Sequence, residues 1–63
     1  MPIIRVEMFP GRSADQKRAL VKELTEGFVR AAGGTEQSVH VILSDVEQSN
    51  WGSGGALYSD KIK

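Results

Sequence analysis

The 63 residues of this chain include no cysteine and only one histidine. Without cysteine the chain has neither disulfides nor thiolate metal sites, and the lone histidine lacks the neighbouring ligands of a structural zinc site. A chain this short buries only about 60% of the surface that its unfolded form exposes. Small domains generally need disulfides, a metal or partner subunits. We therefore expect this chain to be stabilised by self-association.

Net charge is also absent, because eight basic residues balance eight acidic ones. The charges are interspersed, so no field of one sign favours a nucleic acid or an anionic membrane as partner. No apolar run approaches the roughly 18 residues of a membrane span. The start of the chain lacks the basic and apolar regions of a signal peptide. These absences predict a single domain over residues 1–63, in the cytoplasm, with no nucleic-acid or membrane partner.

The first segment with a clear pattern runs from about residue 2 to residue 9. It is rich in β-branched and bulky residues and is followed by the turn signal Pro10-Gly11. Alternation places Ile4, Val6 and Met8 on one face of a strand. The segment therefore predicts a strand with one apolar face and one mixed face.

A helix of about twenty residues is predicted next. Ser13 and Gln16 match a capping box, in which the serine hydroxyl accepts from the third helical N–H and the glutamine side chain reaches back. Gly33-Gly34 supplies the usual C-terminal stop. The apolar positions recur at helical spacing: Leu20, Val21, Leu24, Phe28, Ala31 and Ala32. The helix should lie with one side against a sheet.

A second apolar segment, residues 38–46, has the composition of a central strand. Strand, long helix and strand form a β-α-β unit with parallel strands. The tail, residues 47–63, contains a glycine-rich stretch that suits a small hairpin. We predict an α/β fold: a β-α-β subunit with a short C-terminal hairpin, its sheet completed by another subunit.

Pro2 is the residue whose position carries the strongest chemical consequence. If processing removes Met1, Pro2 is left with a secondary amine. A free α-amino group has a pKa of about 7.7 to 8.0 in model peptides, and burial or a nearby cation lowers it. The amine of Pro2 is therefore a candidate general base. A Met-Pro start is also compatible with processing that serves no catalytic purpose.

Arg12 and Trp51 are two further candidates for a site. Arg12 follows the first turn, and a guanidinium can bind a carboxylate through two hydrogen bonds, although a solvated loop arginine is the simpler interpretation. Trp51, the only tryptophan, lies among glycines rather than in a periodic stripe. It is either an anchor for the hairpin on a neighbouring subunit or an apolar wall that lowers the pKa of a nearby amine.

Taken together, these features resemble the 4-oxalocrotonate tautomerase family. The resemblance rests on Pro2 behind Met1, on the Gly11-Arg12-Ser13 turn with Gln16-Lys17, and on the stretch Trp51-Gly52-Ser53-Gly54-Gly55. It covers nearly the whole chain. It implies an isomerase of β-α-β subunits, commonly a hexamer built as a trimer of dimers, that needs no cofactor or metal and acts in aromatic hydrocarbon catabolism.

The resemblance also implies roles for individual residues. Pro2 would be the general base and acid that interconverts enol and keto forms of a small unsaturated 2-oxo acid such as 2-hydroxymuconate. Arg12 would hold the substrate carboxylate, Trp51 would make the site apolar, and Ser38 falls where the family has an active-site serine. The site would combine residues of more than one subunit.

His40 departs from the family pattern. Members that act on dicarboxylates have a second arginine at this place on the second strand, whereas an imidazole is mostly neutral at pH 7. His40 is either a substrate-binding residue or an ordinary polar-face residue, and Arg5 or a neighbouring subunit could supply the missing cation. The alternatives are therefore altered specificity, for a monocarboxylate such as the enol of phenylpyruvate, or a non-catalytic oligomeric module.

Overall fold

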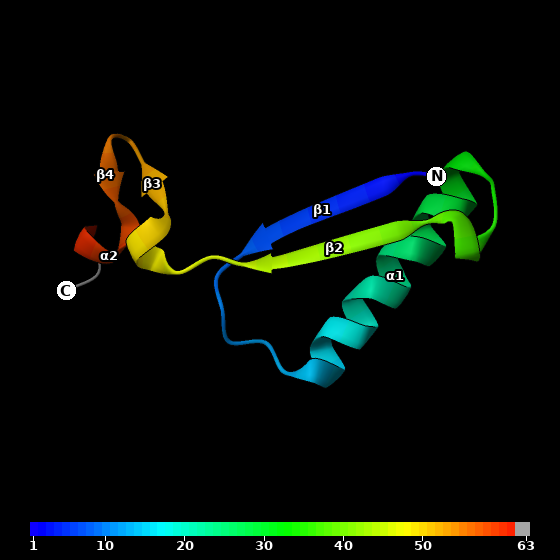
Figure 1. Cartoon of the computed structure of the whole chain (residues 1–63), viewed down its shortest axis with the longest axis horizontal. Coiled ribbons are helices and arrows are strands. Elements are labelled where there is room, and N and C mark those ends of the chain that lie inside the picture. The colour runs from blue at the N-terminus through cyan, green and yellow to red at the C-terminus, as the bar shows by residue number, and fades with distance from the viewer. Residues whose placement is uncertain (62–63) are drawn as a thin grey trace.

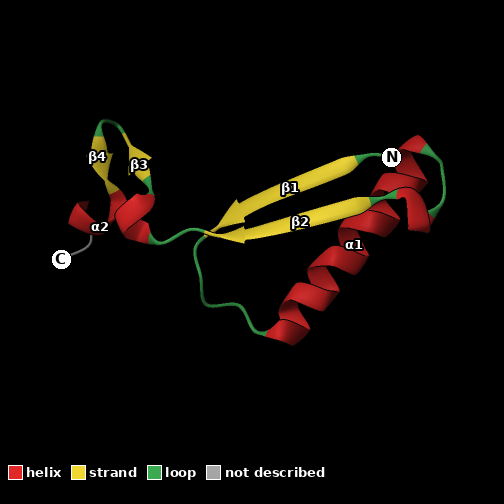
Figure 2. Ribbon diagram, viewed as in Figure 1, coloured by secondary structure: helices red, strands yellow, loops and turns green. Residues whose placement is uncertain are grey.

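The structure is a computed structural model that describes residues 1–61. Its elements follow the predicted order of strand, long helix, strand and hairpin (Figures 1 and 2). They are β1 (Ile3–Met8), α1 (Ala14–Ala32), η1 (Glu36–Ser38), β2 (His40–Asp45), η2 (Gln48–Asn50), β3 (Gly52–Ser53), β4 (Ala56–Leu57) and α2 (Tyr58–Lys61), where η marks a 3₁₀ turn. The α/β class and the β-α-β unit are confirmed.

β1 and β2 form a two-stranded parallel sheet that α1 covers on one face. The register pairs Ile3 with His40 and runs in step to the pair of Met8 with Asp45. Exposure alternates along β1, and Met8, only 9% exposed, is the one buried apolar side chain within residues 1–61. On the face away from the helix, Ile3 and Ile42 remain 57% and 39% exposed. The sheet is thus packed on one side and open on the other.

Local hydrogen bonds fix both ends of α1 where the sequence predicts them. The Ser13 hydroxyl accepts from the Gln16 N–H at 3.1 Å, and the Gln16 side chain accepts from the Ser13 N–H at 2.9 Å. At the other end Gly33, with φ of 86°, donates its N–H to the Val29 carbonyl. A positive φ costs little for glycine because it has no Cβ. The capping box and the glycine stop are both confirmed.

The second strand is shorter than predicted. The sequence indicates a strand over residues 38–46, but residues 36–38 form η1, in which the Ser38 N–H and hydroxyl both bond the Thr35 carbonyl at 3.1 and 2.7 Å. A serine that bonds locally in this way competes with strand pairing. Ser38 therefore precedes β2 rather than lying in it.

The tail forms the predicted hairpin and, in addition, the short helix α2. Gly54 and Gly55 turn the chain with φ of 63° and 84°. The Tyr58 N–H donates to the Trp51 carbonyl at 2.7 Å, and the Lys61 ammonium donates to the Ser53 carbonyl at 2.7 Å. These bonds close the tail on itself, and Figure 1 shows it set apart from the sheet.

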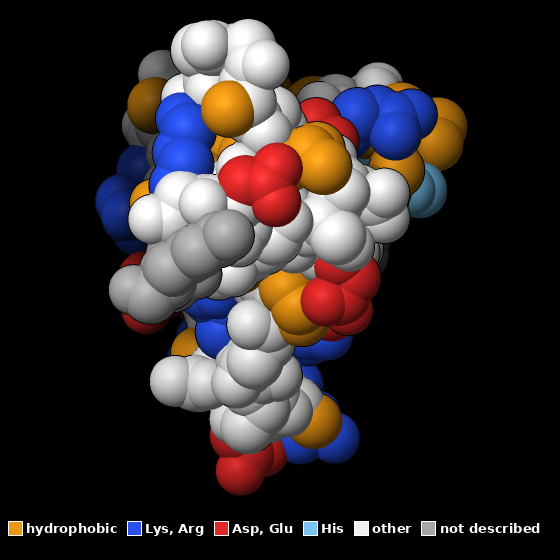
Figure 3. Space-filling model, turned by 90° about the vertical axis from the view of Figure 1, so that its left-hand side faces the viewer, with side chains coloured by type: hydrophobic (Ala, Val, Ile, Leu, Met, Phe, Trp, Pro, Cys, Tyr) orange, Lys and Arg blue, Asp and Glu red, His pale blue; other side chains and the backbone are white. Residues whose placement is uncertain are grey.

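The chain is more extended than a compact domain of its length. Its dimensions are 44 × 25 × 15 Å and its radius of gyration is 14.9 Å, whereas a compact chain of this length should have a radius near about 11 Å. The face shown in Figure 3 carries scattered charges of both signs. Among residues 1–61, no helix combines the length and apolar character needed to cross a membrane.

Candidate active site

Pro2 is held at the head of the sheet. Its carbonyl accepts a hydrogen bond from the His40 backbone N–H at 2.9 Å, one step before the first strand pair. The Pro2 side chain is half-buried, whereas Met1 is 87% exposed. A residue tied into a sheet in this way does not fray. The nitrogen of Pro2 therefore has a defined position, and Met1 projects from it.

His40 and Ser38 lie at the same end of the sheet as Pro2. Figure 1 places the N-terminus beside the turn that leads into β2. His40 is exposed on the open face, directly across from Ile3. Ser38 is half-buried and its hydroxyl donates to the Thr35 carbonyl, so an oxygen lone pair remains to accept from a ligand. Pro2, Ser38 and His40 thus lie at the same end of the sheet.

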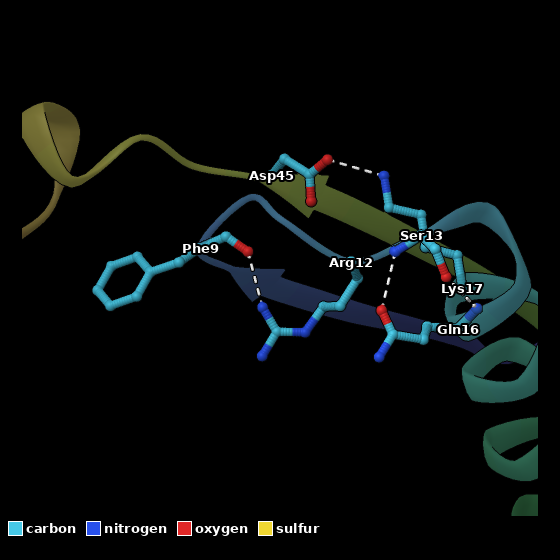
Figure 4. Close-up of polar contacts among 6 residues, drawn as sticks. All are labelled: Phe9, Arg12, Ser13, Gln16, Lys17 and Asp45. Atoms are coloured by element: carbon cyan, nitrogen blue, oxygen red, sulfur yellow. Dashed lines mark hydrogen bonds and ion pairs between the residues drawn. The ribbon is translucent and has the colours of Figure 1, made fainter.

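Arg12 lies at the opposite end of β1. Its Nη1 donates to the Phe9 carbonyl at 2.8 Å (Figure 4), which uses one of five guanidinium N–H donors. An open hollow of about 200 Å³ is lined by Arg12, Gln16, Lys17 and Leu20. This end of the subunit therefore offers a tethered guanidinium beside a space large enough for a small ligand.

Lys17, the second cation of this hollow, is already paired. Its ammonium lies 2.8 Å from the Asp45 carboxylate, and both side chains are 36% exposed. Arg12 has no ion-pair partner within residues 1–61. The positive charge of Lys17 is compensated, so Arg12 is the cation left to attract a carboxylate.

Trp51 packs against a residue of its own chain. Its ring centroid lies 4.6 Å from that of Phe9, with the ring planes at 62°, and Phe9 also lies 4.9 Å from Tyr58. Phe9 was missed by the sequence analysis as a functional candidate. The available signal was composition, since three of only four aromatic residues meet here.

One subunit does not bring all the predicted site residues together. Strands rise about 3.3 Å per residue, so Pro2 and the end of β1 are separated by about 20 Å. Pro2, Ser38 and His40 lie at one end, and Arg12 and Trp51 lie at the other. Within residues 1–61 there is also no group of three His, Cys, Asp or Glu side chains able to hold a metal ion.

Comparison with known proteins gives consistent results. The family model Tautomerase, described as a tautomerase enzyme, matches residues 2–61. A probable tautomerase of Streptococcus pneumoniae is 43% identical over 51 residues, which are 81% of this chain and 85% of that protein. The crystal structure of a 4-oxalocrotonate tautomerase homologue is 40% identical, with a TM-score of 0.85 and complete coverage of both chains.

A further similar structure is an asymmetric trimer of a fused 4-oxalocrotonate tautomerase. It is 34% identical, with a TM-score of 0.84, over 89% of this chain and 46% of that one. The matched part is thus slightly less than half of the fused chain.

Proposed function

The chain belongs to the tautomerase family and is an isomerase, and we propose that it interconverts enol and keto forms of a small unsaturated 2-oxo acid through the amine of Pro2. The observation that carries this proposal is the bond between the His40 N–H and the Pro2 carbonyl, at 2.9 Å. This bond supports the proposal because it holds Pro2 at the start of β1, and positioning of this kind is a large part of what an enzyme contributes to proton transfer.

The proposed reaction is a proton transfer without net change in atoms or charge. Removal of Met1 leaves Pro2 with a secondary amine. In its neutral form this amine takes the proton of the enol hydroxyl, and the electron pair moves along the conjugated chain as the 2-oxo group forms. The resulting ammonium returns the proton to carbon. The same group thus serves as base and then as acid.

Arg12 is the group that we propose to hold the substrate carboxylate. Four of its N–H donors remain after the bond to the Phe9 carbonyl. Charge-assisted hydrogen bonds from a guanidinium are stronger than neutral ones and can be bidentate. The hollow beside it, of about 200 Å³, gives a small acid room to approach.

A complete site requires a second copy of the chain. Pro2 and the far end of β1, beyond which Arg12 lies, are about 20 Å apart, too far for one small substrate to reach both ends. We therefore propose that Pro2, Ser38 and His40 of one subunit meet Arg12 and Trp51 of others in a homo-oligomer, most simply a hexamer built as a trimer of dimers. Two features of the chain support this assembly: its extended shape, and the burial of only one apolar side chain, Met8, among residues 1–61.

The exposed position of His40 favours a second candidate function. In place of an arginine, which is a permanent cation, the open face carries the imidazole of His40. Arg5 is on the same face, paired with Ile42 two residues further along the sheet, and could supply a cation. If it does not, the preferred substrate is a monocarboxylate such as the enol of phenylpyruvate.

The deciding experiment begins with an intact-mass measurement that verifies loss of Met1. The processed protein is then assayed with 2-hydroxymuconate and, in parallel, with the enol of phenylpyruvate, following loss of the dienol or enol absorbance. Turnover of the dicarboxylate supports the main proposal, and turnover of the monocarboxylate alone supports the second. Turnover of neither, or retention of Met1, would leave the non-catalytic oligomeric module.

A further inference from the structure

Phe9 contacts both Arg12 and Trp51, the two candidate site residues at the far end of β1 from Pro2. Its carbonyl accepts from Arg12 Nη1 at 2.8 Å, and its ring packs on Trp51 at 4.6 Å. Figure 4 shows the carbonyl facing Arg12 and the ring pointing away from α1. Phe9 therefore contacts Arg12, the proposed carboxylate-binding residue, through its carbonyl, and Trp51, the proposed apolar wall, through its ring.

Phe9 is itself held firmly by the sheet. It follows Met8, the buried end of β1, whose carbonyl accepts from the Val46 N–H at 2.8 Å. Beyond it, Pro10 and Gly11, with φ of 127°, turn the chain toward α1. A residue that precedes proline is restricted to extended conformations, so Pro10 limits the backbone freedom of Phe9.

The tail, by contrast, has few other attachments to the sheet. Its elements η2, β3, β4 and α2 pack mainly on one another, and Figure 1 shows a thin connection from β2. A 2.7 Å backbone hydrogen bond from the Tyr58 N–H to the Trp51 carbonyl links these two residues within the tail. The ring of Phe9 packs on the rings of both residues, at 4.6 and 4.9 Å between centroids, and so connects the tail to the end of β1.

From this arrangement we infer that Phe9 is a positioning residue, which sets the spacing between the Arg12 guanidinium and the Trp51 ring and so determines the affinity for the carboxylate substrate. The inference rests on the proposed function. Phe9 need not touch the substrate, because it acts by holding two groups that do. Its loss should weaken binding more than it slows proton transfer, since Pro2 lies at the other end of β1.

The test compares the Phe9→Leu and Phe28→Leu variants. Phe28 is the only other phenylalanine, is similarly half-buried, and lies in the second half of α1, away from the tail. Trp51 is the only tryptophan, so the tryptophan fluorescence emission reports on the contact with Phe9 and needs no activity assay. Phe9→Leu should shift that emission to the red, increase its quenching by acrylamide, and raise KM about three- to tenfold with a smaller change in kcat.

Further measurements separate a positioning role from a structural one. Phe9→Tyr keeps the ring and should restore both emission and KM, whereas Phe28→Leu should change neither. Sedimentation must show that the variants keep the wild-type assembly. Unchanged emission in Phe9→Leu, or changed emission with unchanged KM, would overturn the inference. If the processed wild-type protein turns over neither substrate, the proposed function fails, and the emission alone then decides whether Phe9 locates Trp51.

Discussion

The secondary amine of Pro2 is the group on which the proposed proton transfer depends. Pro2→Ala keeps the carbonyl that accepts from His40, so the sheet should remain intact. It replaces the secondary amine by a less rigid primary one. We expect kcat to fall by about 10²-fold or more, the range expected for loss of a well-placed acid-base group.

The measurement is a kinetic assay of the variant after intact-mass confirmation that Met1 is gone. Far-ultraviolet circular dichroism provides the control for folding. Equal kcat values in the variant and the wild type would rule out the amine mechanism.

Arg12 should affect binding rather than the proton transfer itself. A charge-assisted hydrogen bond contributes about 1.5–3 kcal/mol, so Arg12→Ala should raise KM for a carboxylate substrate about tenfold or more. Arg18→Ala is the matched control, because Arg18 is also near the start of α1 and its side chain, 74% exposed, forms an ion pair with Asp15. If both variants have the wild-type KM, Arg12 does not bind the carboxylate.

The helix α1 begins where local hydrogen bonds require it to begin. Ser13→Ala removes the acceptor for the Gln16 N–H, and loss of such a cap costs about 1 kcal/mol. We expect a lower urea midpoint with an unchanged slope. Because assembly contributes to stability, both proteins must be compared at one concentration.

Ser49→Ala, a change at an exposed serine of η2, is the control for the cap. A midpoint that moves no further for Ser13→Ala than for Ser49→Ala would show that the capping box contributes little to the stability of the assembled protein.

At the scale of elements, the sequence predicts best where structure is decided by near neighbours. The bounds of α1 follow from Ser13 and Gly33, whose partners lie within four residues. The start of β2 was misjudged because Ser38 has a strand-like neighbourhood in sequence but bonds Thr35 instead. Whether Ser38 joins the strand or the 3₁₀ turn depends on the relative stability of the local hydrogen bonds and of the sheet pairing, and composition does not reveal that difference.

At the scale of the whole molecule, the chain leaves apolar side chains of its sheet uncovered. Ile3 and Ile42 remain exposed on the open face, at 57% and 39%, and Met8 is the only buried apolar side chain described. We therefore expect sedimentation to give a multiple of the 6.9 kDa chain mass, most simply six copies. Dilution should reduce mass and activity together, because the site is proposed to span subunits.

The dependence on the open face can be tested by Ile42→Lys, which places a charge where a second copy should pack. We expect smaller species and lower activity from this variant. Ala19→Lys, on the exposed side of α1, is its control. A fully active protein of 6.9 kDa at every dilution would contradict both the assembly and the shared site.

The sequence alone determined the order of elements, the ends of α1, the turn at the glycines of the tail and the family resemblance. Periodicity, capping residues and positive-φ glycines act over a few residues, so they can be read without coordinates. The sequence also identified Pro2 as a candidate general base and Arg12 as a candidate carboxylate-binding residue; both roles are still predictions.

Only the tertiary structure decided which of these residues are neighbours. Parallel pairing of β1 with β2 places His40 beside Pro2, while the length of β1 moves Arg12 to the far end. The contact of Phe9 with Trp51 joins residues 42 positions apart in the sequence. Such long-range contacts depend on how whole elements pack, and no local pattern in the chain encodes them.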